Sequence, residues 1–174
     1  MSEMQAEQRS AVVFGARNLG RAVIELLVGD GWAVTGAART QSTLDGVRAS
    51  GALALETDVT DPASVYGVLE QAAAAHGGVD LTVNAASAYG GDRAGPFGGG
   101  PIAEADLDGF DSWAAAPARA AFSFLSASGR FAIAQGRPST LVQVTGGSAR
   151  RAMPSRGRPL ERAVHALGVC HVGL

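Results

Sequence analysis

One short stretch near the start of the chain constrains the fold more than any other. It reads Val12-Val13-Phe14-Gly15-Ala16-Arg17-Asn18-Leu19-Gly20-Arg21-Ala22. The apolar run is typical of a strand that is buried on both faces, and Gly15 and Gly20 allow a tight turn and close packing of the helix that follows. A strand, a glycine turn and a helix start in this order predict the phosphate-cradling opening of a dinucleotide-binding fold.

Strand and helix patterns alternate through the rest of the chain. Further strands are predicted over 32–38, 52–56, 79–84 and 141–145. Helices are predicted over 19–28, 43–50 and 62–76, and from about 104 to 135 with interruptions near Pro117 and Gly129. Strands separated by helices indicate a parallel sheet with right-handed crossovers. We therefore expect an α/β fold, a Rossmann-like three-layer sandwich with a mostly parallel, doubly wound sheet whose C-terminal strands are reduced or missing.

Two of these helices carry a pattern that predicts a buried face. In the first helix the apolar residues at helical spacing are Leu19, Ala22, Val23, Leu26 and Leu27. In the third helix they are Val65, Val68, Leu69 and Ala72. Asp61 and Pro62 precede the third helix as an N-cap and a first helical residue. A sheet that ends at the fifth strand would expose an edge.

Length and composition bound the class of protein. The 174 residues fit one domain, and a hydrophobic fraction of 47% with a net charge of −2 suits a soluble globular protein that has no general affinity for nucleic acid. No apolar run is long enough to span a membrane. The single Cys170 cannot form an internal disulfide, which favours a cytoplasmic location. We expect a flexible arm over 1–9, a Rossmann-like domain over 10–150 and a divergent, arginine-rich tail over 151–174.

Polar or glycine residues stand at or just beyond the carboxyl end of every predicted strand. They are Gly15, Arg39, Asp58, Asn84 and Thr145. In parallel α/β sheets ligands bind beyond these ends, where the strand order reverses. These five positions are therefore expected to meet at one site.

Over roughly residues 10–150 the chain resembles the short-chain dehydrogenase/reductase family. Four segments carry the resemblance: the glycine turn from Gly15 to Ala22, Asp58-Val59-Thr60-Asp61, Asn84-Ala85-Ala86, and Val142-Gln143-Val144-Thr145-Gly146-Gly147. The resemblance implies that an NAD(P) cofactor is bound by Gly15, Ala16, Arg17, Asn18, Leu19, Gly20, Arg39, Asp58, Val59, Asn84, Ala85 and Ala86. The glycine turn departs from the family pattern, because it is one residue short and has lost its middle glycine.

The cofactor expected from these residues is NADP, with NAD as the alternative. No acidic residue occurs from Trp32 to Leu44, and Arg39 stands where an NAD site would place an acid on the ribose. The alternative for Arg39 is a solvated arginine at a strand end. Asp58 either accepts a hydrogen bond from the adenine or caps a helix. Asn84 either lies near the cofactor or closes a buried strand as a turn residue.

The family resemblance implies hydride transfer between the cofactor and a small carbonyl or alcohol, with Thr145 and Ser148 as the candidate catalytic hydroxyls. The family's Tyr-x-x-x-Lys pair is missing, since the chain has no lysine and its tyrosines are Tyr66 and Tyr89. A phenol needs a nearby cation to exchange its proton at neutral pH. Two further hypotheses therefore stay open: a catalytically inactive NADP(H)-binding or oligomer-forming relative, and a truncated, non-functional fragment. No metal site is expected from His165, Cys170 and His171.

Overall fold

The computed structural model describes residues 8–86, 106–111, 115–144 and 170–172. Its sheet contains β1 (Ser10–Phe14), β2 (Ala33–Ala38), β3 (Leu53–Glu56), β4 (Leu81–Asn84), β5 (Ser139–Gln143) and β6 (Cys170–Val172). The strands lie in the order β3-β2-β1-β4-β5-β6. Strands β1 to β5 are parallel, and β6 is antiparallel to β5. The strand order reverses at β1, which places the switch point between β1 and β4.

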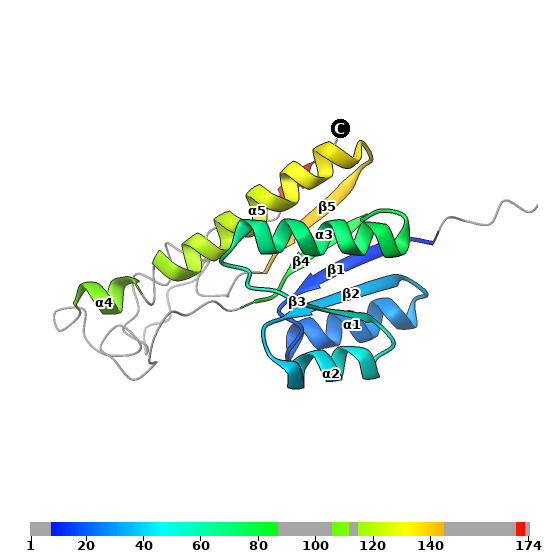
Figure 1. The fold of residues 1–174 in the computed structure, drawn as a ribbon, viewed down its shortest axis with the longest axis horizontal. Coiled ribbons are helices and arrows are strands. Elements are labelled where there is room, and N and C mark those ends of the chain that lie inside the picture. Colours follow the sequence, from blue (N-terminus) through cyan, green and yellow to red (C-terminus); the bar gives the residue numbers. More distant parts are fainter. Residues whose placement is uncertain (1–7, 87–105, 112–114, 145–169, 173–174) are drawn as a thin grey trace, which may run out of the picture.

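Helices cover both faces of this sheet (Figure 1). Helices α1 (Leu19–Gly29) and α2 (Gln41–Ala49) lie on one face, and α3 (Pro62–His76) and α5 (Ala116–Gln135) lie side by side on the other. The short helix α4 (Leu107–Phe110) lies beyond the start of α5. The predicted three-layer, doubly wound α/β fold is therefore confirmed.

Each face of the sheet has its own apolar core, because the side chains of a strand alternate between faces. Val12 and Phe14 point towards α3 and α5, where Phe14 packs edge-to-face on Phe124 with ring centroids 5.7 Å apart. Ala11 and Val13 belong to the core under α1 and α2. All five residues of β1 are buried, as its uninterrupted apolar run predicts.

Helix α3 forms where and how the sequence predicts. The Asp61 carboxylate accepts hydrogen bonds from the N–H groups of Ala63 and Ser64, and Pro62 is the first helical residue. The residues predicted to face the core are all buried, namely Val65, Val68, Leu69 and Ala72. The helix ends at His76 and is followed by Gly77, which adopts a left-handed conformation that glycine tolerates.

The predicted buried face of α1 is wrong in part. Gly20, Ile24 and Leu27 face the core, whereas Leu19 and Leu26 are 55% and 64% exposed and Ala22 is also exposed. Both sets have helical spacing, so periodicity alone could not separate them. The close packing of Gly20 against the turn selects the face that points inward.

One other expectation needs correction. Helix α5 continues without a break through Gly129, and Pro117 lies in its first turn, where a missing N–H costs no hydrogen bond. After β5 the described residues contain the three-residue strand β6, which pairs with the outer edge of β5 through Ser139, Thr140 and Leu141. This short strand agrees with the expected reduction of the C-terminal strands, and it covers part of the edge of β5.

Candidate functional site

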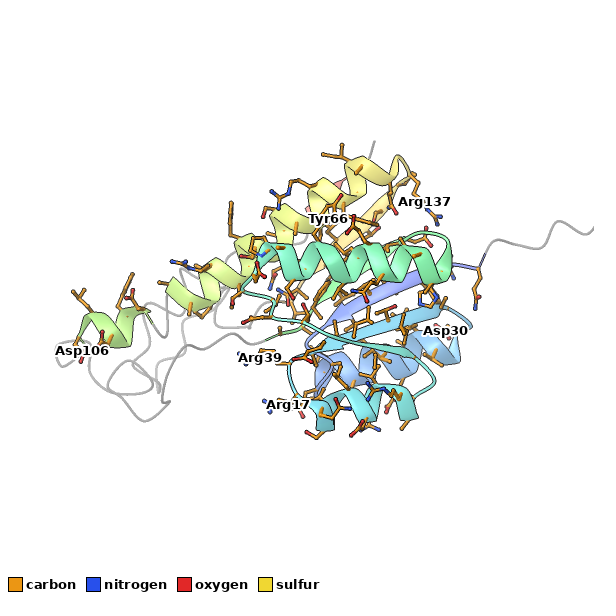
Figure 2. The ribbon with its side chains drawn as sticks, viewed as in Figure 1. Arg17, Asp30, Arg39, Tyr66, Asp106 and Arg137 are labelled. Atoms are coloured by element: carbon orange, nitrogen blue, oxygen red, sulfur yellow. The ribbon has the colours of Figure 1, made fainter. Side chains whose placement is uncertain are left out.

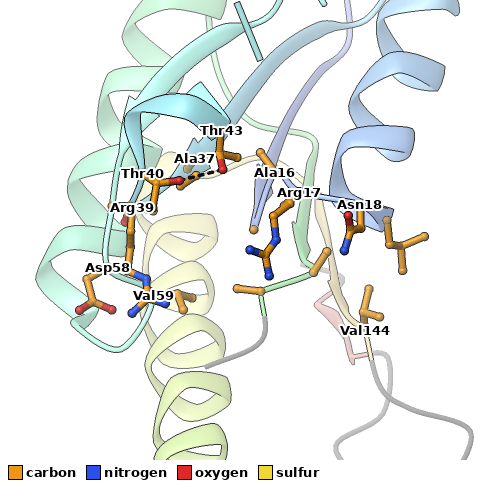
Figure 3. A pocket seen from close by; sticks show the side chains of 16 residues that line it. Ala16, Arg17, Asn18, Ala37, Arg39, Thr40, Thr43, Asp58, Val59 and Val144 are labelled. Carbon is orange, nitrogen blue, oxygen red and sulfur yellow. Dashed lines mark hydrogen bonds between the residues drawn. The ribbon is translucent and has the colours of Figure 1, made fainter. Parts of the chain in front are cut away.

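A cavity of about 390 Å³ opens at the carboxyl ends of the strands, beside the switch point (Figure 3). Most of the predicted site residues line it: 15–19, Arg39, Asp58, Val59, Ala85 and Ala86. They come from the β1–α1 turn and from the segments that follow β2, β3 and β4. Figure 2 shows Arg17 and Arg39 at this end of the molecule and Arg137 at the opposite end. The fold thus brings together residues from Gly15 to Val144, which are far apart in the sequence.

The glycine turn is shaped by contact with the segment after β4. Gly15 has a φ of +82°, and a Cβ atom at this position would collide with the backbone of Ala86. A Cβ atom on Gly20 would collide with the Gly15 carbonyl. Gly20 is not among the residues that line the cavity, and its role in the structure is to let α1 pack against the turn.

Asn18 adopts a backbone conformation in this turn that glycine adopts more easily than other residues. Its φ of +48° and ψ of −109° lie in a region that side chains disfavour, and it is the single non-glycine residue with positive φ among those described. Asn18 is the N-cap of α1, but its side chain makes no capping hydrogen bond. The N–H of Leu19 has no acceptor in the described part of the chain. The turn therefore keeps a backbone donor available at the helix N-terminus despite the missing glycine.

The segment after β2 supplies a cation and two hydroxyl groups. Arg39 is exposed at the end of β2. The Thr40 and Thr43 hydroxyls are 2.8 Å apart and both residues line the cavity (Figure 3). Thr40 is the N-cap of α2, again without a side-chain capping bond. Sequence reasoning missed both threonines, although Thr40 follows shortly after a predicted strand end and could have been indicated by that position.

Asp58 is held as a carboxylate by its own turn. Its Oδ1 accepts hydrogen bonds from the N–H of Thr60, at 2.9 Å, and from the Thr60 hydroxyl, at 2.8 Å. These two bonds are the main reason why the pKa of Asp58 lies below its usual value; burial opposes them, and the nearby Arg39 guanidinium adds to them. Asp61 caps α3, so Asp58 is not the helix cap that the sequence left as an alternative.

Asn84 is buried and lies outside the lining of the cavity. Its amide donates to Gln143 Oε1 at 2.9 Å, and its carbonyl oxygen accepts the N–H of Ala86 at 3.0 Å. These bonds join β4 to β5 and fix the turn at Ala85 and Ala86. The structure therefore gives Asn84 the role of a turn residue that closes a buried strand.

The candidate catalytic residues Thr145 and Ser148 lie outside the described residues, as does Tyr89. Val144, the residue before Thr145, lines the cavity. Tyr66 packs edge-to-face against Phe131 between α3 and α5, with ring centroids 5.8 Å apart, and does not line the cavity.

The described residues contain neither a metal-binding cluster nor a membrane-spanning helix. No three His, Cys, Asp or Glu side chains among them are grouped as a metal ion would need. None of the helices in the described ranges is both long enough and apolar enough to cross a membrane.

The strand order, the glycine turn and the cavity at the switch point define an α/β domain of the Rossmann type. The sequence model described as enoyl-(acyl carrier protein) reductase matches residues 14–167. The chain belongs to this group of proteins, the short-chain dehydrogenase/reductase family.

Known relatives are similar over different parts of the chain. The 3-oxoacyl-[acyl-carrier-protein] reductase FabG of Escherichia coli is 42% identical over 86 residues, which are 47% of this chain and 35% of that protein. The match thus spans about a third of the curated relative. A blue fluorescent protein from a metagenomic library, solved with NADPH, has a TM-score of 0.68 and 25% identity over 91% of this chain and 63% of its own. A short-chain dehydrogenase/reductase from Burkholderia phymatum, solved with NAD, has a TM-score of 0.71 and 23% identity over 92% of this chain and 56% of its own.

Proposed function

We propose that the chain is an NAD(P)(H)-dependent oxidoreductase that transfers a hydride to or from a small carbonyl or alcohol compound. The observation that carries this proposal is the cavity, in which the glycine turn, Arg39, Asp58 and the Ala85-Ala86 segment meet at the switch point of the sheet. Relatives solved with NADPH and with NAD support a nicotinamide cofactor. We also propose a cytoplasmic location, which the single Cys170 favours.

The residues around the cavity fit a dinucleotide. The N–H of Leu19 at the start of α1 would donate to the diphosphate. The ionised Asp58 carboxylate has its Oδ1 bonded to Thr60, which leaves Oδ2 to accept a hydrogen bond from the adenine. Glycine at position 15 lets the turn lie directly against Ala86. The bound cofactor would donate or accept the hydride, and the protein would orient the carbonyl or alcohol substrate.

We propose NADP(H) rather than NAD(H) as the preferred cofactor. Arg39 follows β2 with no acid between Trp32 and Leu44, and a guanidinium there suits a 2′-phosphate. Arg17 reaches the same cavity from the β1–α1 turn (Figure 3). Thr40 and Thr43 add two hydroxyl donors.

Titration of the purified chain with NADPH and with NADH tests this preference. Arg39→Ala is expected to weaken NADPH binding by roughly 10- to 100-fold, because a charged hydrogen-bond donor is worth about 1.5–3 kcal/mol. NADH binding should change little. Arg48→Ala is the matched control, because Arg48 pairs with Asp45 on the exposed surface of α2, away from the cavity. Equal loss for both cofactors, or none, would contradict the assignment of NADP.

Turnover is tested separately from binding, because the Tyr-x-x-x-Lys pair of the family is absent. We propose that the Thr145 and Ser148 hydroxyls orient the substrate oxygen. NADPH oxidation with a panel of small carbonyl compounds should then be measurable and should fall in Thr145→Val and Ser148→Ala. Tight NADPH binding without oxidation of any panel compound would instead identify a binding protein.

We also propose that the chain forms a homo-oligomer. Leu107 on α4 and Phe122 on α5 are 80% and 70% exposed, and Ile133 further along α5 is 62% exposed. Large apolar side chains that are left exposed on α4 and α5 favour contact with another protein surface. Light scattering during size-exclusion chromatography should give more than the monomer mass of 17.5 kDa, and Phe122→Ser should lower it.

A further inference from the structure

The loop that carries Asp58 is held in place by a side chain on the far helix α5. The Ser123 hydroxyl donates a hydrogen bond to the Thr60 carbonyl at 3.0 Å. Ser123 is 3% exposed and Thr60 is half-buried, so the donor end of this bond lies within the protein. The two residues are separated by 63 positions in the sequence, and the contact joins α5 directly to the connection between β3 and α3.

The Thr60 carbonyl depends on this donor because of how α3 begins. The N–H groups of Ala63 and Ser64 are taken by the Asp61 carboxylate, and the N–H of Val65 bonds to the Asp61 carbonyl. These three N–H groups of α3 are therefore not available to the carbonyl of Thr60, the residue before the N-cap. In the described part of the chain, the Ser123 hydroxyl is the donor that satisfies this carbonyl.

Thr60 in turn sets the orientation of Asp58. Its N–H and its hydroxyl both donate to Asp58 Oδ1, which fixes the plane of the carboxylate at the cavity. The same two bonds are the main cause of the lowered pKa of Asp58. Thr60 thus accepts one hydrogen bond from α5 at its carbonyl and donates two hydrogen bonds to the Asp58 carboxylate, which lines the cavity.

A second anchor holds the other end of the loop. Ser64 Oγ lies 3.0 Å from the Thr57 hydroxyl and accepts the N–H of Asp58 at 3.2 Å. Val59, between the two anchors, is buried in the core with Phe124 of α5. The cavity-lining stretch is therefore fixed from α3 at its start and from α5 at its end.

We propose that Ser123 is a positioning residue for Asp58, and that it sets the affinity for the adenine end of the dinucleotide without touching that ligand. This inference rests on the proposed function, because it concerns the wall of the same cavity. Loss of the Ser123 hydroxyl would leave the Thr60 carbonyl without its donor, so the turn at Thr60 would shift or fluctuate. Asp58 would then lose the fixed geometry of its two hydrogen bonds.

The test compares Ser123→Ala with two serine variants of the same helix. Ser128 is 2% exposed, and no hydrogen-bond partner is found for its hydroxyl among the described residues, so Ser128→Ala controls for removing a buried hydroxyl. Ser126 bonds to the Ser123 carbonyl within α5 at 3.3 Å, so Ser126→Ala controls for a local helix bond.

Two readouts need no cofactor. Amide hydrogen exchange at Thr60 should become at least several-fold faster in Ser123→Ala, and the Asp58 pKa, followed by NMR, should rise towards its ordinary value of 3.8. A third readout is binding: NADPH and adenosine 2′,5′-bisphosphate should each bind about three- to ten-fold more weakly, the range for one lost hydrogen bond. The two controls should match the original chain in all three.

The outcomes separate the two proposals. If the original chain binds NADPH and Ser123→Ala behaves like Ser128→Ala in exchange, pKa and affinity, the role of Ser123 is overturned while the proposed function stands. If the original chain binds neither NADPH nor the bisphosphate, the proposed function fails, and the role of Ser123 towards an adenine ligand fails with it. Slower exchange at Thr60 in the variant would also contradict the proposal.

Discussion

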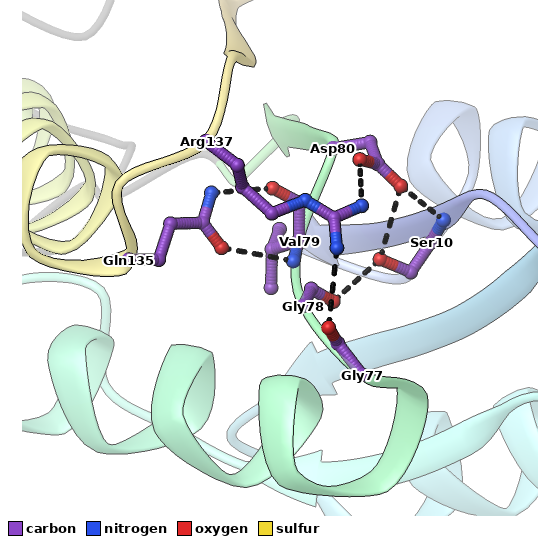
Figure 4. A network of polar contacts seen from close by, with 7 residues as sticks. All are labelled: Ser10, Gly77, Gly78, Val79, Asp80, Gln135 and Arg137. Atoms are coloured by element: carbon purple, nitrogen blue, oxygen red, sulfur yellow. Dashed lines mark hydrogen bonds and ion pairs between the residues drawn. The ribbon is translucent and has the colours of Figure 1, made fainter. Parts of the chain in front are cut away.

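The Arg137 guanidinium forms an ion pair with Asp80 and donates a second hydrogen bond, 3.1 Å long, to the Gly77 carbonyl (Figure 4). Asp80 also accepts the N–H of Ser10 at 2.8 Å. Both charged side chains are less than a third exposed, and the network joins β1, the start of β4 and the connection between α5 and β5. It lies at the end of the sheet opposite the cavity.

Arg137→Ala should therefore lower the free energy of unfolding by about 1–3 kcal/mol, because it leaves Asp80 and Gly77 without a partly buried donor. Urea denaturation measures the change. Arg48→Ala is the control, since its ion pair with Asp45 is exposed and should contribute less than about 1 kcal/mol. Equal effects of the two substitutions would contradict a structural role for the network.

Acid should weaken the same network. Burial raises the pKa of Asp80, but the bonds from Ser10 and Arg137 outweigh it, and the pKa lies below the usual 3.8. The stability that Asp80 contributes is complete above pH 3.8 and is lost as the pH falls through the lower folded-state pKa. Asp80→Asn should remove this part of the acid dependence, and denaturation curves collected from pH 5 to pH 2 would show it.

Replacement of Gly20 by alanine should damage the fold and the cavity together. The added methyl group would collide with the Gly15 carbonyl, which is backbone and cannot turn aside. We expect a loss of roughly 1–3 kcal/mol of stability and a loss of cofactor binding. Gly67→Ala, within α3, has open space at its Cβ and should instead stabilise the chain by up to about 1 kcal/mol. Thermal unfolding of the two variants should shift in opposite directions.

Asn18→Gly should make the chain more stable. Asn18 has a φ of +48°, and its side chain makes no capping bond that glycine would lose. Relief of backbone strain of about 1–3 kcal/mol exceeds the added chain entropy of glycine, about 0.5–1 kcal/mol. Asn18→Ala should lower stability instead, because alanine tolerates a positive φ less well than asparagine. The pair of variants, tested by urea denaturation, therefore isolates the backbone effect. A stabilising alanine would show that the turn is not strained.

His76 should make stability depend on pH near neutrality. Its Nε2 lies 3.0 Å from the Thr35 hydroxyl, and burial lowers its pKa below the usual 6.5. The unfolded chain therefore binds a proton first, so the free energy of unfolding falls as the pH drops through 6.5 and levels off below the folded-state pKa. His76→Gln can keep the bond to Thr35 without titrating. Melting temperatures between pH 7.5 and pH 5 should vary less in this variant, and parallel curves would refute the role of His76.

Much of the fold follows from local patterns in the sequence. The apolar run of β1 and the cap formed by Asp61 and Pro62 each depend on neighbouring residues, so they can be read directly. The pairing of β6 with β5 could not, because three residues at an edge carry no periodic signal. The inward face of α1 was also ambiguous, since Leu19 and Leu26 have the same spacing as residues that face the core.

The candidate site was predictable to the extent that it follows strand ends. Gly15, Arg39 and Asp58 were found because parallel strands bring their carboxyl ends to one edge. Contacts made from the opposite helix were not, as the bond between Ser123 and Thr60 depends on how α5 packs. The sequence predicts Asn84 either near the cofactor or as a turn residue, and its bonds to Gln143 and Ala86 depend on how β4 and β5 pair, which local patterns do not show.

The central place of β1 has a consequence for how the chain folds during synthesis. This strand pairs with β2 on one side and with β4 on the other, and its first residue, Ser10, bonds to Asp80, which lies 70 residues further along the chain. At a translation rate of roughly 5–20 residues per second, that partner leaves the ribosome about 4–14 seconds after Ser10. During that interval one side of the most buried strand has no native neighbour, so the nascent chain is most open to aggregation or chaperone binding before β4 emerges.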